Sequence, residues 1–253
     1  MLNMIQSERL KYKRTFAKKL VYIAPFFFVL YAIITMPTIH SKYNYFEYTV
    51  FNWWPLIFLP LGTALIASLA AMREKKSGNY RALRCHDISI PRMWFSKIIV
   101  IAYYTLLSSI ELIILLILLK LFLPNSISSA AVVVMASLTI WITSLAYIPI
   151  GLFFAERFGT VISIIVSLIG IVLGVVMAPE SYWMFIPWSW GMRLMSPIVG
   201  VHPNGVPLKE GNPLLDPSVI PIGILASIVI FVLLSLVTAF WFSRKEHSCN
   251  EEI

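Results

Sequence analysis

Charged residues are scarce in this 253-residue chain, because Asp, Glu, Lys and Arg together make up only 13% of it. An average soluble domain has about twice that share. Apolar residues make up 59%, and the mean hydropathy is +0.83. A soluble domain of this length needs more polar residues to cover its surface, and a disordered chain has fewer aromatic residues than the 14% found here. The remaining class is a polytopic membrane protein.

Cysteine and the common catalytic motifs are also scarce. Cys85 and Cys249 cannot build a disulfide scaffold. The sequence has no G-x-x-x-x-G-K-[ST] motif, so we expect no ATP binding by that route, and it has no H-E-x-x-H motif, which disfavours an intramembrane metalloprotease. We therefore expect no catalytic, cofactor-binding or metal-binding residues and no enzyme activity in this chain.

Long uncharged runs locate the membrane spans, since about 20 mainly apolar residues are needed to cross the bilayer core as a helix. One run of 35 uncharged residues is too long for a single span, and Pro124-Asn125-Ser126 divides it. The apolar runs do not alternate in polarity, which favours helices over strands. The sequence predicts one all-α membrane domain over 1–253, with six transmembrane helices at about 20–37, 50–72, 97–123, 129–153, 159–178 and 219–242.

The distribution of Lys and Arg predicts the orientation. Sixteen of these residues flank the span ends on one side, against four on the other. Basic residues accumulate in cytoplasmic segments. We therefore expect both termini to be cytoplasmic, together with Cys85 and Cys249, which should stay reduced there.

The first 19 residues are expected to form a helix that lies in the membrane interface. One helical face would carry the apolar side chains of Leu2, Ile5, Tyr12 and Phe16, interrupted by Arg9. Lys11 and Lys18 would project away from it, toward anionic headgroups. The alternative is a solvated basic tail that only enforces the topology.

The connection from Arg73 to Lys97 is longer than two antiparallel helices require. Tyr80, Leu83 and Arg84 share one helical face, next to Arg81. A short helix held clear of the membrane in this way would suit a permease that is driven by a cytoplasmic motor. The alternative is a basic loop that only satisfies the topology.

An aromatic segment, 180–216, is expected on the outer face. The stretch 182–194 is too apolar for an open loop and too broken to span, so it predicts a re-entrant or interfacial segment. Its tryptophans and those that enter span two from the same face would form one lateral entrance: Trp53, Trp54, Trp183, Trp188 and Trp190. The alternative is an aromatic belt that only anchors the helices.

Glu111 lies near the middle of the third predicted span, where a carboxylate costs roughly 3 kcal/mol on insertion scales. With Ser108 it would face the bundle interior and mark a polar pathway; a protonated, hydrogen-bonded glutamate with a structural role is the alternative. On the fifth span, Gly170 and Gly174 form a G-x-x-x-G motif that permits close helix contact.

The whole chain resembles a type 2 ABC exporter permease, and more narrowly the lantibiotic-immunity permeases of the MutE/EpiE type. Six spans, the basic connection after span two and the aromatic outer segment carry the likeness. So do several short stretches: Asn52-Trp53-Trp54-Pro55, Lys75-Lys76-Ser77-Gly78-Asn79-Tyr80-Arg81-Ala82-Leu83, Trp94-Phe95-Ser96-Lys97, Ile186-Pro187-Trp188-Ser189-Trp190 and His202-Pro203-Asn204-Gly205.

The resemblance implies a multi-pass protein of the bacterial cytoplasmic membrane, without nucleic-acid partners. Tyr80, Arg81, Leu83 and Arg84 would dock on an ATP-binding subunit, present in two copies, which would hold ATP and Mg. A second permease, identical or homologous, would complete an exporter that expels an amphipathic lanthionine peptide from the membrane and protects the producer. Three alternatives stay open: export of another peptide antibiotic of the bacitracin kind, a membrane assembly or signalling subunit, and an intramembrane enzyme.

Overall fold

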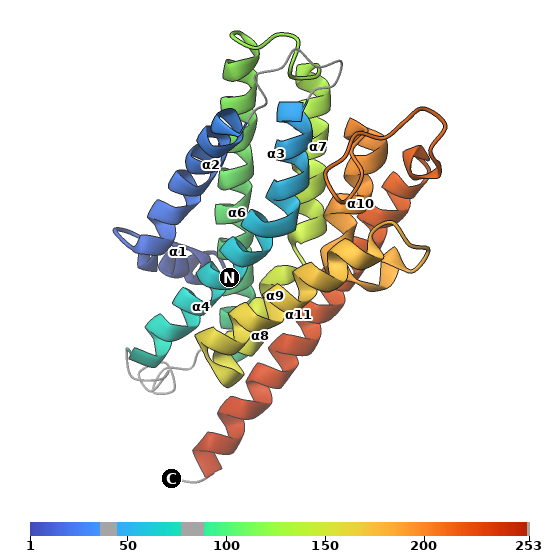
Figure 1. The fold of residues 1–253 in the computed structure, drawn as a ribbon. Helices are drawn as coiled ribbons and strands as arrows, with labels where there is room; N and C mark the ends of the chain where they lie inside the picture. The colour runs from blue at the N-terminus through green and yellow to red at the C-terminus, as the bar shows by residue number, and fades with distance from the viewer. Residues whose placement is uncertain (36–44, 77–88, 252–253) are drawn as a thin grey trace.

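The computed structural model describes residues 1–35, 45–76 and 89–251, with side chains described through Arg244. Apart from one isolated bridge between Val201 and Pro207, the described residues contain helices and turns. The α-helices, shown in Figure 1, are α1 (Leu2–Lys11), α2 (Phe16–Ile34), α3 (Tyr45–Trp53), α4 (Leu59–Lys76), α6 (Ile90–Lys120), α7 (Ala130–Ser144), α8 (Tyr147–Phe158), α9 (Thr160–Met177), α10 (Pro187–Val199) and α11 (Val219–Glu251). Three short elements join them: the π-helix η1 (Trp54–Phe58) and the 3-10 helices η2 (Trp183–Phe185) and η3 (Pro213–Leu215).

The described residues contain six helical segments long and apolar enough to cross a membrane, as the sequence predicts. They are Phe16–Ile34, Tyr45–Lys76, Ile90–Lys120, Ala130–Phe158, Thr160–Met177 and Val219–Arg244. Their outward surfaces are apolar: in the last segment only 17% of the most apolar window is buried. Apolar surface on this scale is compatible with lipid rather than water.

Several span boundaries differ from the prediction, and the differences have local causes. The first span begins at Phe16 instead of residue 20, because the Thr15 hydroxyl caps the helix by accepting a hydrogen bond from the Lys18 amide at 3.4 Å. The third span begins at Ile90 instead of residue 97, with Pro91 in its first turn. Lys97, taken as the limit of that span, is instead buried inside the helix.

Two spans are interrupted. In the second, α3 passes into the π-helix η1, which contains Pro55, before α4 begins. Proline lacks the amide hydrogen that a regular helix needs, and π-turns often accommodate such a defect. In the fourth, α7 and α8 are separated at Leu145 and Ala146.

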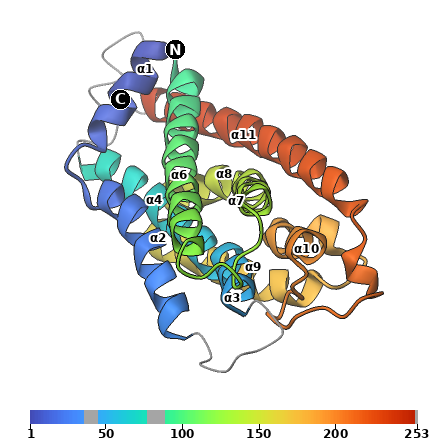
Figure 2. The ribbon, with the colours of Figure 1, turned by 90° about the horizontal axis from the view of Figure 1, so that it is seen from above.

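Figure 1 shows the end of α11 at the bottom of the molecule, with the end of α4 and then α1 above it, whereas the 121–129 connection lies at the top. Figure 2 shows the arrangement of the helices from above, with α11 along one side. Two buried apolar clusters lie between the helices. One surrounds Phe28, Trp54 and Trp190, and the other surrounds Trp94, Ile98 and Phe242.

Candidate functional site

The predicted coupling residues Tyr80, Arg81, Leu83 and Arg84 lie outside the described residues. The helices on either side of them are described: α4 ends at Lys76 and α6 begins at Ile90. The candidate site is a cluster of charged side chains at the base of this connection.

Lys97 lies at the centre of the cluster. Its ammonium nitrogen donates to Glu8 Oε1 at 3.0 Å and to Glu74 Oε1 at 2.8 Å. All three side chains are buried, with 2%, 3% and 5% of the residue exposed for Lys97, Glu8 and Glu74. Buried ion pairs therefore connect α6 with α1 and with α4.

Lys11 and Arg73 extend the cluster toward the surface. Lys11 Nζ donates to Glu8 Oε1 at 2.6 Å and to Glu74 Oε1 at 2.7 Å. Arg73 Nη1 donates to the Lys11 carbonyl at 2.9 Å, and its guanidinium carbon lies 4.6 Å from the centre of the Tyr12 ring. We call these six residues the ion network: Glu8, Lys11, Tyr12, Arg73, Glu74 and Lys97.

Burial gives this network its rigidity. A buried ion pair contributes little net stability against an apolar replacement, but loss of one partner leaves an uncompensated charge and costs about 3–5 kcal/mol. The carboxylates and ammonium groups are therefore held to one geometry. A displacement of α4 or α6 at this level must carry α1 with it or break charged contacts.

The pKa values of two residues of the ion network, Lys11 and Tyr12, are shifted. Burial acts to lower the pKa of Lys11, but the Glu8 and Glu74 carboxylates outweigh it, so this pKa lies above its ordinary value. Burial raises the pKa of Tyr12 well above its ordinary range, which the nearby Arg73 guanidinium offsets only in part.

The N-terminal segment differs in detail from its prediction. A helix is present, but it ends at Lys11, and Arg14 has a φ of 62° that separates it from α2. The four predicted apolar residues do not share one face of α1, because Leu2 is 75% exposed, Tyr12 is buried and Phe16 belongs to α2, while the placement of α1 in the membrane interface stays a prediction. Lys11 does not project away, since it binds Glu8 and Glu74. The buried side of α1 is thus charged.

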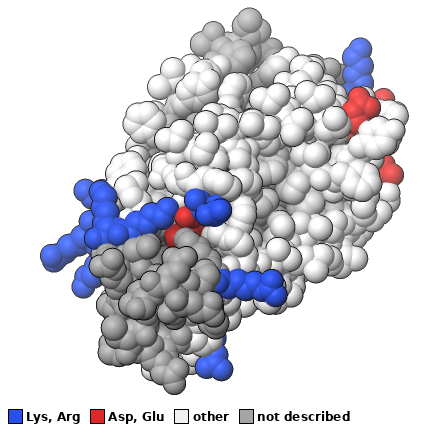
Figure 3. All heavy atoms as spheres, turned by 90° about the horizontal axis from the view of Figure 1, so that it is seen from below, with Lys and Arg blue, Asp and Glu red and all other residues white. Residues whose placement is uncertain are grey.

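Sequence reasoning missed Glu8, Glu74 and Lys97 as site residues. The available signal was two isolated carboxylates within strongly basic segments that flank different spans. Only the packing of α1 across α4 and α6 brings them together. Figure 3 views this end from below and shows the surrounding Lys and Arg side chains gathered on one part of the face, with few acidic side chains among them.

The predicted polar pair on α6 is only partly assembled. Glu111 is half-buried, and its Oε2 atom is buried without a hydrogen-bond partner among the described residues. Ser108 instead lines a small cavity of about 30 Å³ with Trp54 and Thr63, and Glu111 is not among its lining residues. A pathway through both residues stays a prediction.

The predicted outer tryptophans are divided among three environments. Trp54, Trp183 and Trp190 are buried in one apolar cluster, where Trp190 Nε1 donates to the Met184 carbonyl at 3.0 Å. Trp53 is 38% exposed, and Trp188 is half-buried. The entrance stays a prediction, and Trp53 offers the most accessible ring of the five.

Trp188 fills the glycine motif of α9. A Cβ atom at Gly170 would lie 2.3 Å from its indole ring, and one at Gly174 would lie 2.8 Å from its backbone. The indole also stacks on Tyr147, with ring centres 5.4 Å apart. The motif therefore accepts α10 of the same chain, and α10 is held against the fifth span.

Asn52 attaches the outer segment to the second span. Its Nδ2 donates to the carbonyls of Pro203 at 2.9 Å and His202 at 3.3 Å. Gly205 follows with a φ of 89°, and a Cβ there would lie 3.4 Å from Asn52 Oδ1. Thus α10 and the following turn are fixed to α3 and α9, while a re-entrant path through the membrane stays a prediction.

Comparison with known proteins gives the family. No curated protein and no solved structure matches the chain. The family model described as ABC-2 family transporter protein matches residues 4–174, which include most of α1, the ion network and the first four spans together with most of α9. With its six apolar helices the chain is a multi-pass integral membrane protein. It belongs to the ABC-2 family of transporter proteins, and is thus the membrane permease subunit of an ABC transporter whose ATP-binding partner is a separate subunit.

Proposed function

We propose that this permease exports an amphipathic antimicrobial peptide of the lantibiotic type, and so protects the cell that makes it. In this proposal the end of the molecule that carries α1 and the ion network faces the cytoplasm. Two ATP-binding subunits dock there, and a second permease, identical or homologous, completes the complex. The peptide is taken from the outer leaflet and released into the medium.

The ion network carries the coupling part of the proposal. A permease whose ATP is hydrolysed on another subunit must receive force through a rigid contact. Glu74 of α4 and Lys97 of α6 lie on the two helices that flank the 77–88 connection, and they bind each other. Each of them also binds a charged residue of α1. A push on the connection therefore reaches α1, α4 and α6 together rather than bending one of them.

The aromatic outer end supports a peptide substrate. A cationic amphipathic peptide rests at the headgroup layer, where an exporter needs flat, apolar and rigid surface. A tryptophan ring supplies such a surface and also attracts lysine side chains, by about 0.5–1 kcal/mol at exposed sites. Trp53, the exposed last residue of α3 in the second span, is the ring that we assign to first contact.

The substrate test uses the permease together with its ATP-binding subunit, expressed in a sensitive host. If the permease exports a lantibiotic, the minimal inhibitory concentration of that peptide should rise, whereas that of bacitracin should not change. Protection against bacitracin alone would favour the other peptide class. No protection and no peptide-stimulated ATP hydrolysis by the purified complex would favour an assembly or signalling subunit.

The docking test places a charge in the predicted contact face. Leu83→Asp should abolish protection and reduce co-purification of the ATPase, while the permease stays in the membrane. Leu121→Asp is the matched control, because Leu121 is exposed at the opposite end of the molecule. Unchanged co-purification of the ATPase with Leu83→Asp would refute docking at this face.

The entrance test replaces the accessible ring. Trp53→Leu keeps an apolar side chain but removes the flat face, so peptide-stimulated ATP hydrolysis should fall while basal hydrolysis persists. Phe122→Leu is the control, since Phe122 is an exposed aromatic residue outside the tryptophan set. Equal stimulation in the wild type and Trp53→Leu would leave Trp53 as an anchor only.

A further inference from the structure

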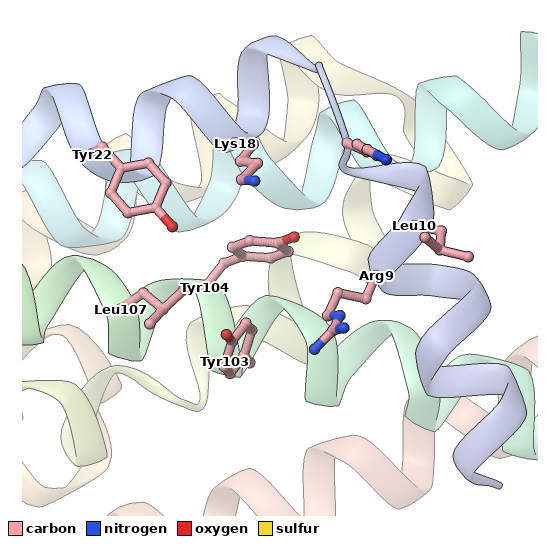
Figure 4. A pocket seen from close by; sticks show the side chains of 8 residues that line it. Arg9, Leu10, Lys18, Tyr22, Tyr103, Tyr104 and Leu107 are labelled. Carbon is pink, nitrogen blue, oxygen red and sulfur yellow. The ribbon is translucent and has the colours of Figure 1, made fainter.

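A cavity of about 330 Å³ lies between α1, α2 and α6, next to the ion network residue Tyr12 that packs on its Tyr104 wall. Lys18 and Tyr22 line it from α2, and Tyr103, Tyr104 and Leu107 line it from α6. Figure 4 shows Lys18 and Tyr22 extending toward Tyr104, with Arg9 reaching the tyrosine pair from α1.

The charged groups of this cavity are all cationic. Arg9, Lys13 and Lys18 line it, and no carboxylate does. Lys11, on the same helix as Arg9, is paired with Glu8 and Glu74, whereas the three lining cations form no ion pair within the described part of the chain. The cavity thus collects positive charge that no described carboxylate neutralises.

The remaining wall is aromatic and apolar. Tyr103 and Tyr104 lie edge to face, with ring centres 5.4 Å apart, and Leu107 follows one helical turn further into the span. Tyr22 and Tyr103 are both 43% exposed, so the cavity opens on the lipid-facing side of two apolar spans. Cations lie at its membrane-surface end, hydroxyl-bearing rings follow, and Leu107 lies deepest.

This gradient matches an anionic phospholipid: a phosphodiester at the surface and acyl chains below it. Basic pockets between transmembrane helices bind such headgroups, and each Lys or Arg near an anionic surface adds to the attraction. A small soluble anion would make no contact with the apolar wall. A nucleotide would have to enter through the membrane, because the cavity opens on the lipid-facing side. We propose that the cavity binds one anionic phospholipid, its phosphate held by Arg9, Lys13 and Lys18.

The bound lipid would join α1 and α6, which the ion network also joins, and would add α2 in place of α4. Tyr104 lies in the cavity wall, and its ring also packs against Tyr12, with centres 4.6 Å apart. The phosphate would draw Arg9 of α1 toward Lys18 of α2, and the Tyr104–Tyr12 contact connects that site with Arg73. The bound lipid would therefore add a further contact that holds α1 in place.

The test uses the full-length chain, purified in a neutral detergent without lipid and examined by native mass spectrometry. It is titrated with dioleoyl phosphatidylglycerol and, separately, with dioleoyl phosphatidylcholine. We expect the first phosphatidylglycerol adduct to bind more tightly than the first phosphatidylcholine adduct. The variant Arg9→Gln with Lys18→Gln should weaken phosphatidylglycerol binding by about 25-fold, or about fivefold for each cation.

The matched control is Arg14→Gln with Lys19→Gln, which removes two exposed cations of the same segment that do not line the cavity. Its affinity should stay within about threefold of the wild type, since its phosphate contacts are intact. Equal losses in the two double variants would overturn the proposal, because attraction would then depend on net charge alone. Equal binding of the two lipids would overturn it as well.

Two further arms test the ligand class and the location. Millimolar inorganic phosphate should not displace the lipid, and complete displacement would show a phosphate site instead of a lipid site. Leu107→Trp fills the cavity without changing its charge and should weaken phosphatidylglycerol binding. Unchanged binding by a Leu107→Trp protein that elutes as the wild type does would exclude this cavity as the lipid site.

Discussion

Lys97 and Glu74 lie 23 residues apart, on the two helices that flank the connection between the second and third spans, and their side chains form a buried hydrogen-bonded ion pair of 2.8 Å. The pair closes the base of that connection. Because the same Lys97 nitrogen also binds Glu8, the closed base is attached to the N-terminal helix.

The first prediction concerns the stability of this base. Lys97→Met leaves Glu8 and Glu74 with too few cations, so the free energy of unfolding should fall by about 3 kcal/mol, which lowers Tm by roughly 6–12 °C. The measurement is thermal unfolding of the purified chain in detergent. Lys19→Met, which removes an exposed cation, is the control.

The double variant Glu74→Met with Lys97→Met separates charge loss from packing loss. It removes the pair together, and apolar replacements of a buried pair are often neutral. Its Tm should therefore recover more than half of the loss seen with Lys97→Met. A double variant as unstable as the sum of the single variants would contradict the role of the ion pair.

The second prediction concerns alkaline pH. The folded state raises the pKa of Lys11 above its ordinary 10.5 and that of Tyr12 above its ordinary 10.0, so both groups hold their protons more tightly when folded. The stability that they contribute is complete below about pH 10 and is lost as the pH rises through the folded values. Unfolding at increasing pH should show a steep loss of Tm above pH 10.

Variants identify the source of that loss. Lys11→Gln and Tyr12→Phe cannot lose these protons, so each should have a flatter alkaline profile than the wild type, whatever its stability at neutral pH. Lys19→Gln lies outside the network and should follow the wild type. Parallel profiles for all four proteins would mean that other groups control alkaline unfolding.

The third prediction concerns the contact between α9 and α10. Gly170→Ala places a methyl group within the Trp188 ring, so the free energy of unfolding should fall by about 1–3 kcal/mol. Gly62→Ala is a matched control in another helix, because a Cβ there meets no atom within 4 Å. It should be neutral or stabilising, since alanine favours helix over glycine by about 1 kcal/mol. Equal Tm values for the two variants would contradict the close packing.

The fourth prediction concerns orientation. In a background with Cys85→Ser and Cys249→Ser, cysteines introduced for the exposed Asn125 and Glu210 should react with an impermeant maleimide added to intact cells. In the unaltered chain, the native Cys85 and Cys249 should react only after the membrane is opened. The expectation follows from the basic residues at the opposite end. Labelling of Cys85 in intact cells would reverse the proposed topology.

The sequence was sufficient for the number and type of the spans. Six apolar runs of membrane length determine them, because each helix satisfies its own backbone hydrogen bonds and must match the bilayer thickness. The boundaries of the spans were predicted less accurately from the sequence. Charge was taken to end a span, and at Lys97 this failed because carboxylates from α1 and α4 neutralise the ammonium group inside the helix bundle.

The candidate site depended on tertiary structure. Glu8 and Lys97 are 89 residues apart, and their neighbours in sequence give no indication that they meet. The same holds for Trp188 and Gly170, where the glycine motif predicted a close contact but not its partner. Composition and run length thus determined a six-span membrane protein, since lipid acts on each segment separately. Which side chains are paired, buried or left facing a cavity was decided only by helix packing, because those energies depend on neighbours that the chain brings together from a distance.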